Sequence, residues 1–151
     1  MLDDLDRRLL RGLQDDPTLS VPDLADRAGL SAARAARRLD KLRSTGVLKG
    51  QRALIDWAAL GYAVEVSLRF TLDKTQRNAF DEFIQAVREV PEVIEIQTFL
   101  GKVDVRLNVL ARDMTHYQQL YRERILTLPH IADIEALMHV ATVKSQDRLP
   151  I

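Results

Sequence analysis

Four basic residues follow the spacing of a single helix face. Arg34, Arg37, Arg38 and Lys41 stand at positions i, i+3, i+4 and i+7, so a helix would place them side by side. Ser31, three residues before Arg34, is of a type that caps helix starts. A helix whose amide end attracts phosphate and whose face carries cations suits a DNA major groove. The alternative interpretation is an amphipathic helix with a solvated basic face.

The charge of the chain is unevenly distributed. Its 151 residues hold 22 Lys and Arg against 22 Asp and Glu, and this zero net charge alone argues against a nucleic-acid binder. Residues 31–52, however, contain seven basic side chains and one acidic one, a net of +6, whereas residues 1–30 have a net of −3. Such a concentration in a neutral chain predicts an electrostatic contact surface.

The first 46 residues are predicted to form a helix-turn-helix arrangement. A leucine stripe predicts a first helix that ends before Pro17. The second helix begins after Ser20 and ends at Gly29, which can adopt the positive φ of a tight turn. The third runs from Ser31 to about Gly46, and its apolar face should meet the core through Ala35, Leu39 and Leu42. Residues 47–55 could add a short hairpin.

The second half of the chain alternates strands and helices. Period-two patterns predict strands over 62–72, 93–100, 103–111 and 131–144, with helices over about 80–87 and 114–128. This β-α-β-β-α-β order is typical of the ferredoxin-like fold. Both helices then cover one face of the sheet. The last strand is apolar on both sides, through Ile134 on one and Leu137 and Val143 on the other, which predicts that another subunit covers the bare face.

Several chemistries lack the residues they need. The chain has no cysteine, and His116, His130 and His139 lie in different predicted elements, so we expect no metal site. We find no phosphate loop or nucleophile motif and predict no cofactor, no catalytic residue and no enzyme activity. The apolar runs are too short to span a membrane, and the start of the chain is acidic where a signal peptide is basic. We therefore expect a cytoplasmic protein with no membrane contact.

Several short segments, in this order and spacing, resemble the Lrp/AsnC (leucine-responsive, feast/famine) family of transcriptional regulators. The segments are Leu5-Asp-Arg-Arg-Leu-Leu10, Asp23-Leu-Ala-Asp-Arg-Ala-Gly-Leu-Ser31, Arg38-Leu-Asp-Lys-Leu42, Gly46-Val-Leu-Lys-Gly50, Gly101-Lys-Val-Asp104 and Leu128-Pro-His-Ile131. The resemblance covers nearly the whole chain. It implies an α+β protein with an N-terminal helix-turn-helix (winged) DNA-binding domain over 1–55, a linker over 56–61, and a C-terminal ferredoxin-like effector-binding and oligomerisation domain over 62–151.

The resemblance also implies partners and site residues. The partners are double-stranded DNA, a second copy in a dimer that assembles into a tetramer or octamer, and an amino-acid effector. It implies a bacterial or archaeal, nucleoid-associated location. The DNA-facing positions are Ser31, Ala33, Arg34, Arg37, Arg38, Lys41, Lys49 and Arg52. Many relatives carry other residues at Ala32, Ala33 and Arg37, so the base preferences of the family do not carry over.

An effector is expected near the glycine turn between the second and third strands. The resemblance places it at Leu100, Gly101, Lys102, Val103, Asp104 and Ala136. Backbone amides and Lys102 could bind a carboxylate, and Asp104 could accept from an ammonium group. In the competing interpretation, Asp104 is a structural residue of the turn.

A second class of function stays open at this point. The chain could be a metabolite-binding oligomer whose N-terminal helices serve assembly alone. The basic block over 31–52 favours DNA binding, because an assembly arm has no need of six excess cations.

Overall fold

The computed structural model describes residues 2–145 and 148–151. These residues form two compact units, one of the residues up to Leu54 together with those from Lys144 onward, and one of Ile55–Val143. Within the residues described, no helix is long and apolar enough to cross a membrane.

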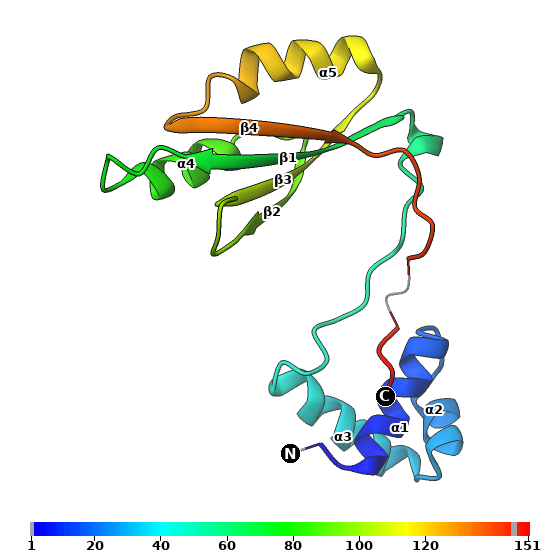
Figure 1. Ribbon diagram of the computed structural model, residues 1–151. Coiled ribbons are helices and arrows are strands. Elements are labelled where there is room, and N and C mark those ends of the chain that lie inside the picture. Colours follow the sequence, from blue (N-terminus) through cyan, green and yellow to red (C-terminus); the bar gives the residue numbers. More distant parts are fainter. Residues whose placement is uncertain (1, 146–147) are drawn as a thin grey trace. The chain divides into compact units, whose positions relative to one another are not determined.

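The first unit is built from three helices, α1 (Asp4–Asp15), α2 (Val21–Ala28) and α3 (Ala32–Ser44) (Figure 1). The predicted caps are confirmed, since the Ser20 and Ser31 hydroxyls accept from backbone amides in the first turns of α2 and α3. Gly29 ends α2 with φ 71°, a conformation that glycine adopts without steric cost. The three helices enclose a core of Leu9, Leu24, Ala25, Ala28, Leu30, Ala35, Leu39 and Leu42.

The predicted hairpin after α3 is wrong. No strand is found between α3 and the short 3₁₀ turn η1 (Ala58–Leu60). Leu48 instead packs against the helical core, and its amide donates to the Leu42 carbonyl at 2.9 Å. Leu54 and Ile55, which would form the second strand of such a hairpin, are exposed. A two-stranded hairpin without a packing partner is marginally stable in water.

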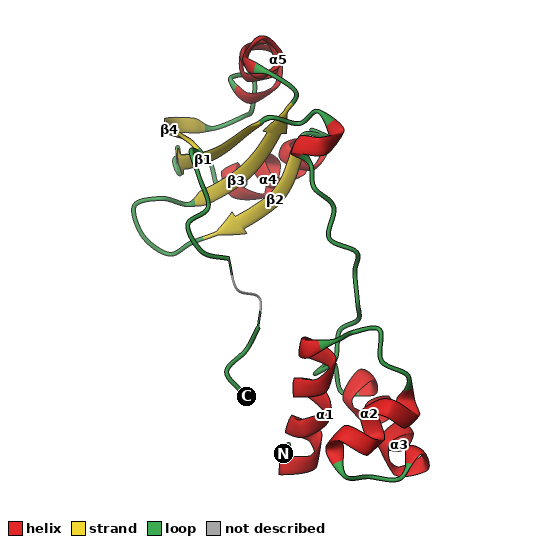
Figure 2. Ribbon diagram, turned by 90° about the vertical axis from the view of Figure 1, so that its right-hand side faces the viewer, coloured by secondary structure: helices red, strands yellow, loops and turns green. Residues whose placement is uncertain are grey.

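The second unit is a four-stranded antiparallel sheet with two helices. It contains β1 (Val64–Leu72), α4 (Ala79–Arg88), β2 (Val93–Thr98), β3 (Val105–Ala111), α5 (Met114–Leu120) with a π-helical continuation η2 (Tyr121–Ile125), and β4 (Ile131–Met138). The strand order is β2-β3-β1-β4, and the predicted β-α-β-β-α-β order is confirmed (Figure 2). One face of the sheet packs under both helices, where Phe70 contacts Phe83 of α4 at a centroid distance of 5.0 Å.

The opposite face of the sheet, here called the open face, is polar rather than apolar. Arg69 of β1 lies opposite Arg106 of β3 and Glu135 of β4. Ion pairs join Arg69 to Glu135 at 3.5 Å and Arg106 to Glu95 of β2 at 3.4 Å. The expectation that the last strand is apolar on both sides is therefore wrong for this face at Asp133 and Glu135. No helix of the described chain covers the face, and its coverage by another subunit stays a prediction.

The last strand is shorter than predicted. β4 ends at Met138, opposite Val66, and just beyond it the His139 amide donates to the Glu65 carbonyl of β1 at 2.9 Å. Val140 and Val143 lie beyond the strand and are almost fully exposed. Leu137 is the apolar residue that β4 adds to the open face.

The C-terminal residues belong to the helical unit. The Gln14 side chain accepts from the Leu149 amide at 2.6 Å and donates to its carbonyl at 3.3 Å. Arg148 pairs with Asp15 at 2.8 Å. The predicted range 62–151 for the second domain therefore differs from the observed grouping, which assigns residues from Lys144 onward to the first unit. A chain end of ordinary polarity carries no local sign of these contacts with α1.

Candidate nucleic-acid interface and effector site

Helix α3 has two distinct faces. Ala35, Leu39 and Leu42 are 0–3% exposed and pack in the helical core, as predicted. Arg34 and Arg37 are exposed on the other side, and neither forms an ion pair within the described residues. The sequence therefore produces a helix that is anchored along one side and cationic along the other.

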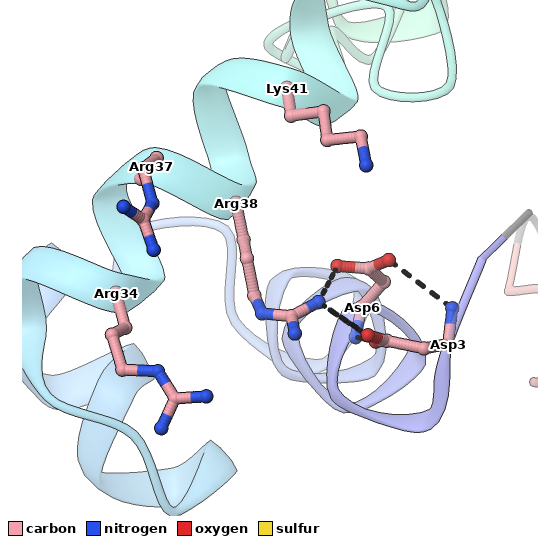
Figure 3. Close-up of a pocket in the computed structure, with 6 residues that line it drawn as sticks. All are labelled: Asp3, Asp6, Arg34, Arg37, Arg38 and Lys41. Atoms are coloured by element: carbon pink, nitrogen blue, oxygen red, sulfur yellow. Dashed lines mark hydrogen bonds and ion pairs between the residues drawn. The ribbon is translucent and has the colours of Figure 1, made fainter.

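Arg38 differs from the other cations of this face. Its Nη1 donates to both oxygens of Asp3, at 2.9 and 2.7 Å, and to Oδ1 of Asp6 at 2.7 Å (Figure 3). Its side chain is 25% exposed, and that of Asp6 is 10% exposed. These contacts raise the pKa of Arg38, with the Asp6 bond as the larger cause and the Asp3 bond next.

Asp3 and Asp6 are the residues that the sequence reasoning missed. They form a capping box at the start of α1, in which each carboxylate accepts from the backbone amide of the other residue. The Asp6 amide, followed by the Arg38 guanidinium, lowers the pKa of Asp3. The signal in the sequence is the pair of acids three residues apart before a leucine stripe, which predicts the cap but not its basic partner.

A hollow of about 330 Å³ lies on the surface of the helical unit. It is lined by the two aspartates and by four cations of α3, namely Asp3, Asp6, Arg34, Arg37, Arg38 and Lys41. Figure 3 shows Arg34, Arg37 and Lys41 along α3 with Arg38 directed toward Asp3 and Asp6 of α1. The lining is therefore mostly cationic, with both carboxylates gathered around Arg38.

The other proposed DNA-facing residues are dispersed. Ser31 is occupied as the cap of α3, where its hydroxyl accepts from the Arg34 amide at 3.4 Å. Ala33 is exposed in the first turn of α3. Lys49 and Arg52 are exposed in the segment after α3, which forms no strand.

Asp104 is the last residue of the turn between β2 and β3. The Asp104 residue is 7% exposed. Its Oδ2 accepts from the Leu72 amide at 2.9 Å, and its Oδ1 contacts Nζ of Lys74 at 2.7 Å. Burial raises the pKa of Asp104, but the bonds from Lys74 and Leu72 outweigh it and hold that pKa below its usual value. The carboxylate thus joins the turn to the end of β1.

The remaining residues proposed for an effector do not form one cluster. Leu100 and Gly101 are exposed at the tip of the turn. Lys102 and Val103 line a hollow of about 380 Å³ with Arg69, Thr71, Asp133, Ile134 and Glu135. Ala136 pairs with Leu68 and so points to the other face of the sheet, away from this hollow.

The three histidines are each paired with a glutamate. His130 contacts Glu82, His116 lies 3.6 Å from Glu92, and His139 lies 3.6 Å from Glu65. No group of three or more potential metal ligands occurs in the described part of the chain.

Comparisons with known proteins also divide the chain into two domains, although the second match extends past Val143, where the second compact unit ends. A model of winged helix-turn-helix DNA-binding domains matches residues 2–49, and a model of Lrp/AsnC ligand-binding domains matches residues 65–149. The DNA-binding transcriptional activator DecR of Escherichia coli K12 is 32% identical, over 100% of this chain and 99% of its own. The proline dehydrogenase transcriptional activator of Rhodobacter capsulatus is 31% identical, over 97% and 96% of the two chains.

Solved structures extend the same relationship. An AsnC family transcriptional regulator from Agrobacterium tumefaciens has a TM-score of 0.86 and 33% identity, covering 99% of this chain and 97% of its own. A feast or famine regulatory protein from M. tuberculosis, complexed with L-methionine, has a TM-score of 0.85 and 26% identity, covering 99% of both chains. With both domains matched in order, the chain belongs to the Lrp/AsnC family of DNA-binding transcriptional regulators.

Proposed function

We propose that the chain binds double-stranded DNA through the exposed face of α3 and regulates transcription there, in the cytoplasm. This proposal is supported by the two faces of α3, one buried and apolar, the other exposed with Arg34, Arg37 and Lys41. A helix so anchored presents its cations rigidly, which suits insertion into a major groove. The segment after α3 adds Lys49 and Arg52, which suit contacts with the phosphate backbone.

A salt titration of DNA binding tests this proposal. The double variant Arg34→Ala/Arg37→Ala should weaken binding and reduce the steepness of its salt dependence, because each lost phosphate contact lowers the slope by about 0.9. Arg88→Ala, at the end of α4 in the other unit, removes one like charge as the control. If the double variant bound DNA as tightly as the parent, with its thermal unfolding unchanged, α3 would not be the reader.

The second unit is proposed to bind an amino acid beside the turn of Leu100–Asp104. This proposal is supported by the family and by the relative from M. tuberculosis that is complexed with L-methionine. The hollow beside the turn offers Lys102 and Arg69 to a carboxylate and Asp133 to an ammonium group. Asp104 is assigned to the framework of the turn, since both its oxygens already have partners.

Thermal-shift screening of the twenty amino acids tests the effector site. A stabilising amino acid should lose its effect in Lys102→Ala, whereas Arg88→Ala should respond as the parent does. The absence of any shift at millimolar concentrations would remove the effector from the proposal and leave a regulator that acts through DNA and assembly.

We also propose that two copies pair through the open face of the sheet and assemble further into a tetramer or octamer. No helix of the described chain covers this face, and its arginines and glutamates alternate in sign, so a second copy could offer complementary charges. Such a dimer would present two α3 helices to two half-sites. Light scattering should show an even oligomer at micromolar concentration, and a monomer there would overturn this assignment.

A further inference from the structure

We infer that Asp3 and Asp6 are positioning residues for DNA recognition, which turn one edge of the Arg38 guanidinium toward DNA. The inference rests on the proposed function of α3.

The observation is that a single nitrogen of Arg38 makes all three contacts. Nη1 bonds Asp3 Oδ1, Asp3 Oδ2 and Asp6 Oδ1. Within residues 2–145 and 148–151, Nε and Nη2 have no acceptor in the protein. Three of the five N–H bonds of a guanidinium are carried by these two nitrogens.

The unused edge has a specific shape. Nε–H and one Nη2–H are parallel, so they form the fork with which arginine binds two acceptors side by side. On DNA such paired acceptors are two oxygens of one phosphate, or O6 and N7 of a guanine in the major groove. A carboxylate pair that takes Nη1 therefore leaves Arg38 with its bidentate edge available.

The surroundings of Arg38 indicate that the carboxylates orient its guanidinium and do not merely neutralise its charge. Asp6 is buried and fixed in the capping box of α1, so it is a rigid support for a side chain that comes from α3. Figure 3 shows Arg38 extended from α3 toward this support, in the same hollow as Arg34 and Lys41. Fixing a flexible side chain before binding reduces the entropy lost on binding.

The two possible roles of the carboxylates, orienting Arg38 and repelling DNA, predict opposite changes in DNA affinity when their charge is removed. If the two carboxylates only repelled DNA, then removing their charge would strengthen binding. If they orient Arg38, the same change weakens specific binding although the protein becomes more positive. Asparagine keeps the capping function at the start of α1, so Asp3→Asn/Asp6→Asn should retain the fold.

The experiment uses the full chain and two duplexes, one enriched by the protein from a random pool and one of scrambled sequence. Asp3→Asn/Asp6→Asn should weaken binding to the enriched duplex about tenfold, with little loss on the scrambled one. The matched control is Asp40→Asn on α3, whose carboxylate pairs with Arg43 at 3.2 Å and not with Arg38. That variant should bind both duplexes at least as tightly as the parent.

Arg38→Lys provides a second variant that is independent of the cap. It keeps the charge but has no flat edge, so the ratio of enriched to scrambled affinity should fall while the salt dependence is retained. A purely structural role for Arg38 would leave that ratio unchanged at equal thermal stability. Either an unchanged ratio in both variants or tighter binding by Asp3→Asn/Asp6→Asn would overturn the inference.

A modified duplex distinguishes the two acceptors. Replacing guanine by 7-deazaguanine removes N7. If this weakens the parent but not Arg38→Lys, the fork binds guanine; an equal effect on both proteins assigns it to a phosphate. Failure of the parent to enrich any duplex from the random pool would instead refute the proposed function of α3.

Discussion

Replacing Asp104 tests whether the β2–β3 turn is held by a framework carboxylate. In Asp104→Ala the Leu72 amide loses its acceptor at a position where Leu72 is 4% exposed. A buried donor without a partner costs about 1–3 kcal/mol. The contact with Lys74 adds less than about 1 kcal/mol, because that lysine side chain is 67% exposed.

The expected loss is therefore about 1–4 kcal/mol of unfolding free energy. For a unit of this size, about 1 kcal/mol corresponds to roughly 4–8 °C in Tm, so thermal denaturation should show a fall of roughly 4–30 °C in the transition of the α/β unit. Asp104→Asn keeps an acceptor for Leu72 and should lose less than about 1 kcal/mol. Asp133→Ala, at an exposed aspartate of β4, is the control and should change Tm little.

The pH dependence has a definite sign. Burial raises the pKa of Asp104, the bonds from Lys74 and Leu72 lower it by more, and the folded value lies below the ordinary 3.8. A carboxyl group whose pKa is lower in the folded protein than in the unfolded chain stabilises the fold at pH values above the unfolded-state pKa. This stabilisation is lost as the pH falls through the folded-state pKa. The stability difference between the parent and Asp104→Asn should therefore shrink below about pH 3.8. An unchanged Tm in Asp104→Ala, combined with loss of an amino-acid response, would show that Asp104 is a ligand contact instead.

Two backbone positions offer further tests by thermal or urea denaturation. His130 has φ 61°, so His130→Gly should be more stable than His130→Ala by about 1 kcal/mol, and the reverse order would contradict a strained backbone there. Gly29 has φ 71°, and no neighbouring atom lies within 4 Å of the place that a Cβ would take. Gly29→Ala should therefore cost about 1–2 kcal/mol from the backbone alone, and Gly29→Asn less; an equal cost for the two variants would contradict this reasoning.

The helices of the first unit could be predicted because their determinants are local. Ser20, Ser31 and Gly29 each act within one turn of their own helix, and cap chemistry is readable from neighbouring residues. The alternation of β1 is equally local, since its even positions from Val66 onward are buried. These elements needed no knowledge of distant partners.

The end of β4 could not be predicted, because it depends on a partner strand. The apolar pattern continues to Val143, yet pairing stops at Met138, where β1 is near its first residue. The same limit applies to the open face of the sheet. Residue types on β4 alone suggested an apolar surface, whereas the register places Glu135 beside Arg69.

The basic face of α3 was predicted in position but not in its effective charge. Helical spacing places Arg38 with its neighbours, but its partners Asp3 and Asp6 lie 35 and 32 residues away. Spacing within one helix carries no information on such pairs. The region that the sequence counts as a block of net +6 is therefore less cationic in the folded protein.

This pairing predicts which cations determine the salt dependence of DNA binding. Arg43 pairs with Asp40 at 3.2 Å. Arg43→Ala therefore removes a cation that is already paired within the protein and leaves the Asp40 carboxylate without this partner. Arg34 has no such partner in the described residues and faces the hollow on α3. Arg34→Ala should then lower the slope of log K against log salt by about 0.9, whereas Arg43→Ala should weaken binding without that change in slope. Binding measured by fluorescence anisotropy between about 50 and 200 mM salt resolves the two cases. Equal slopes for both variants would mean that DNA binding depends on the total charge of residues 31–52 and not on the cations of α3 that have no ion-pair partner in the described residues.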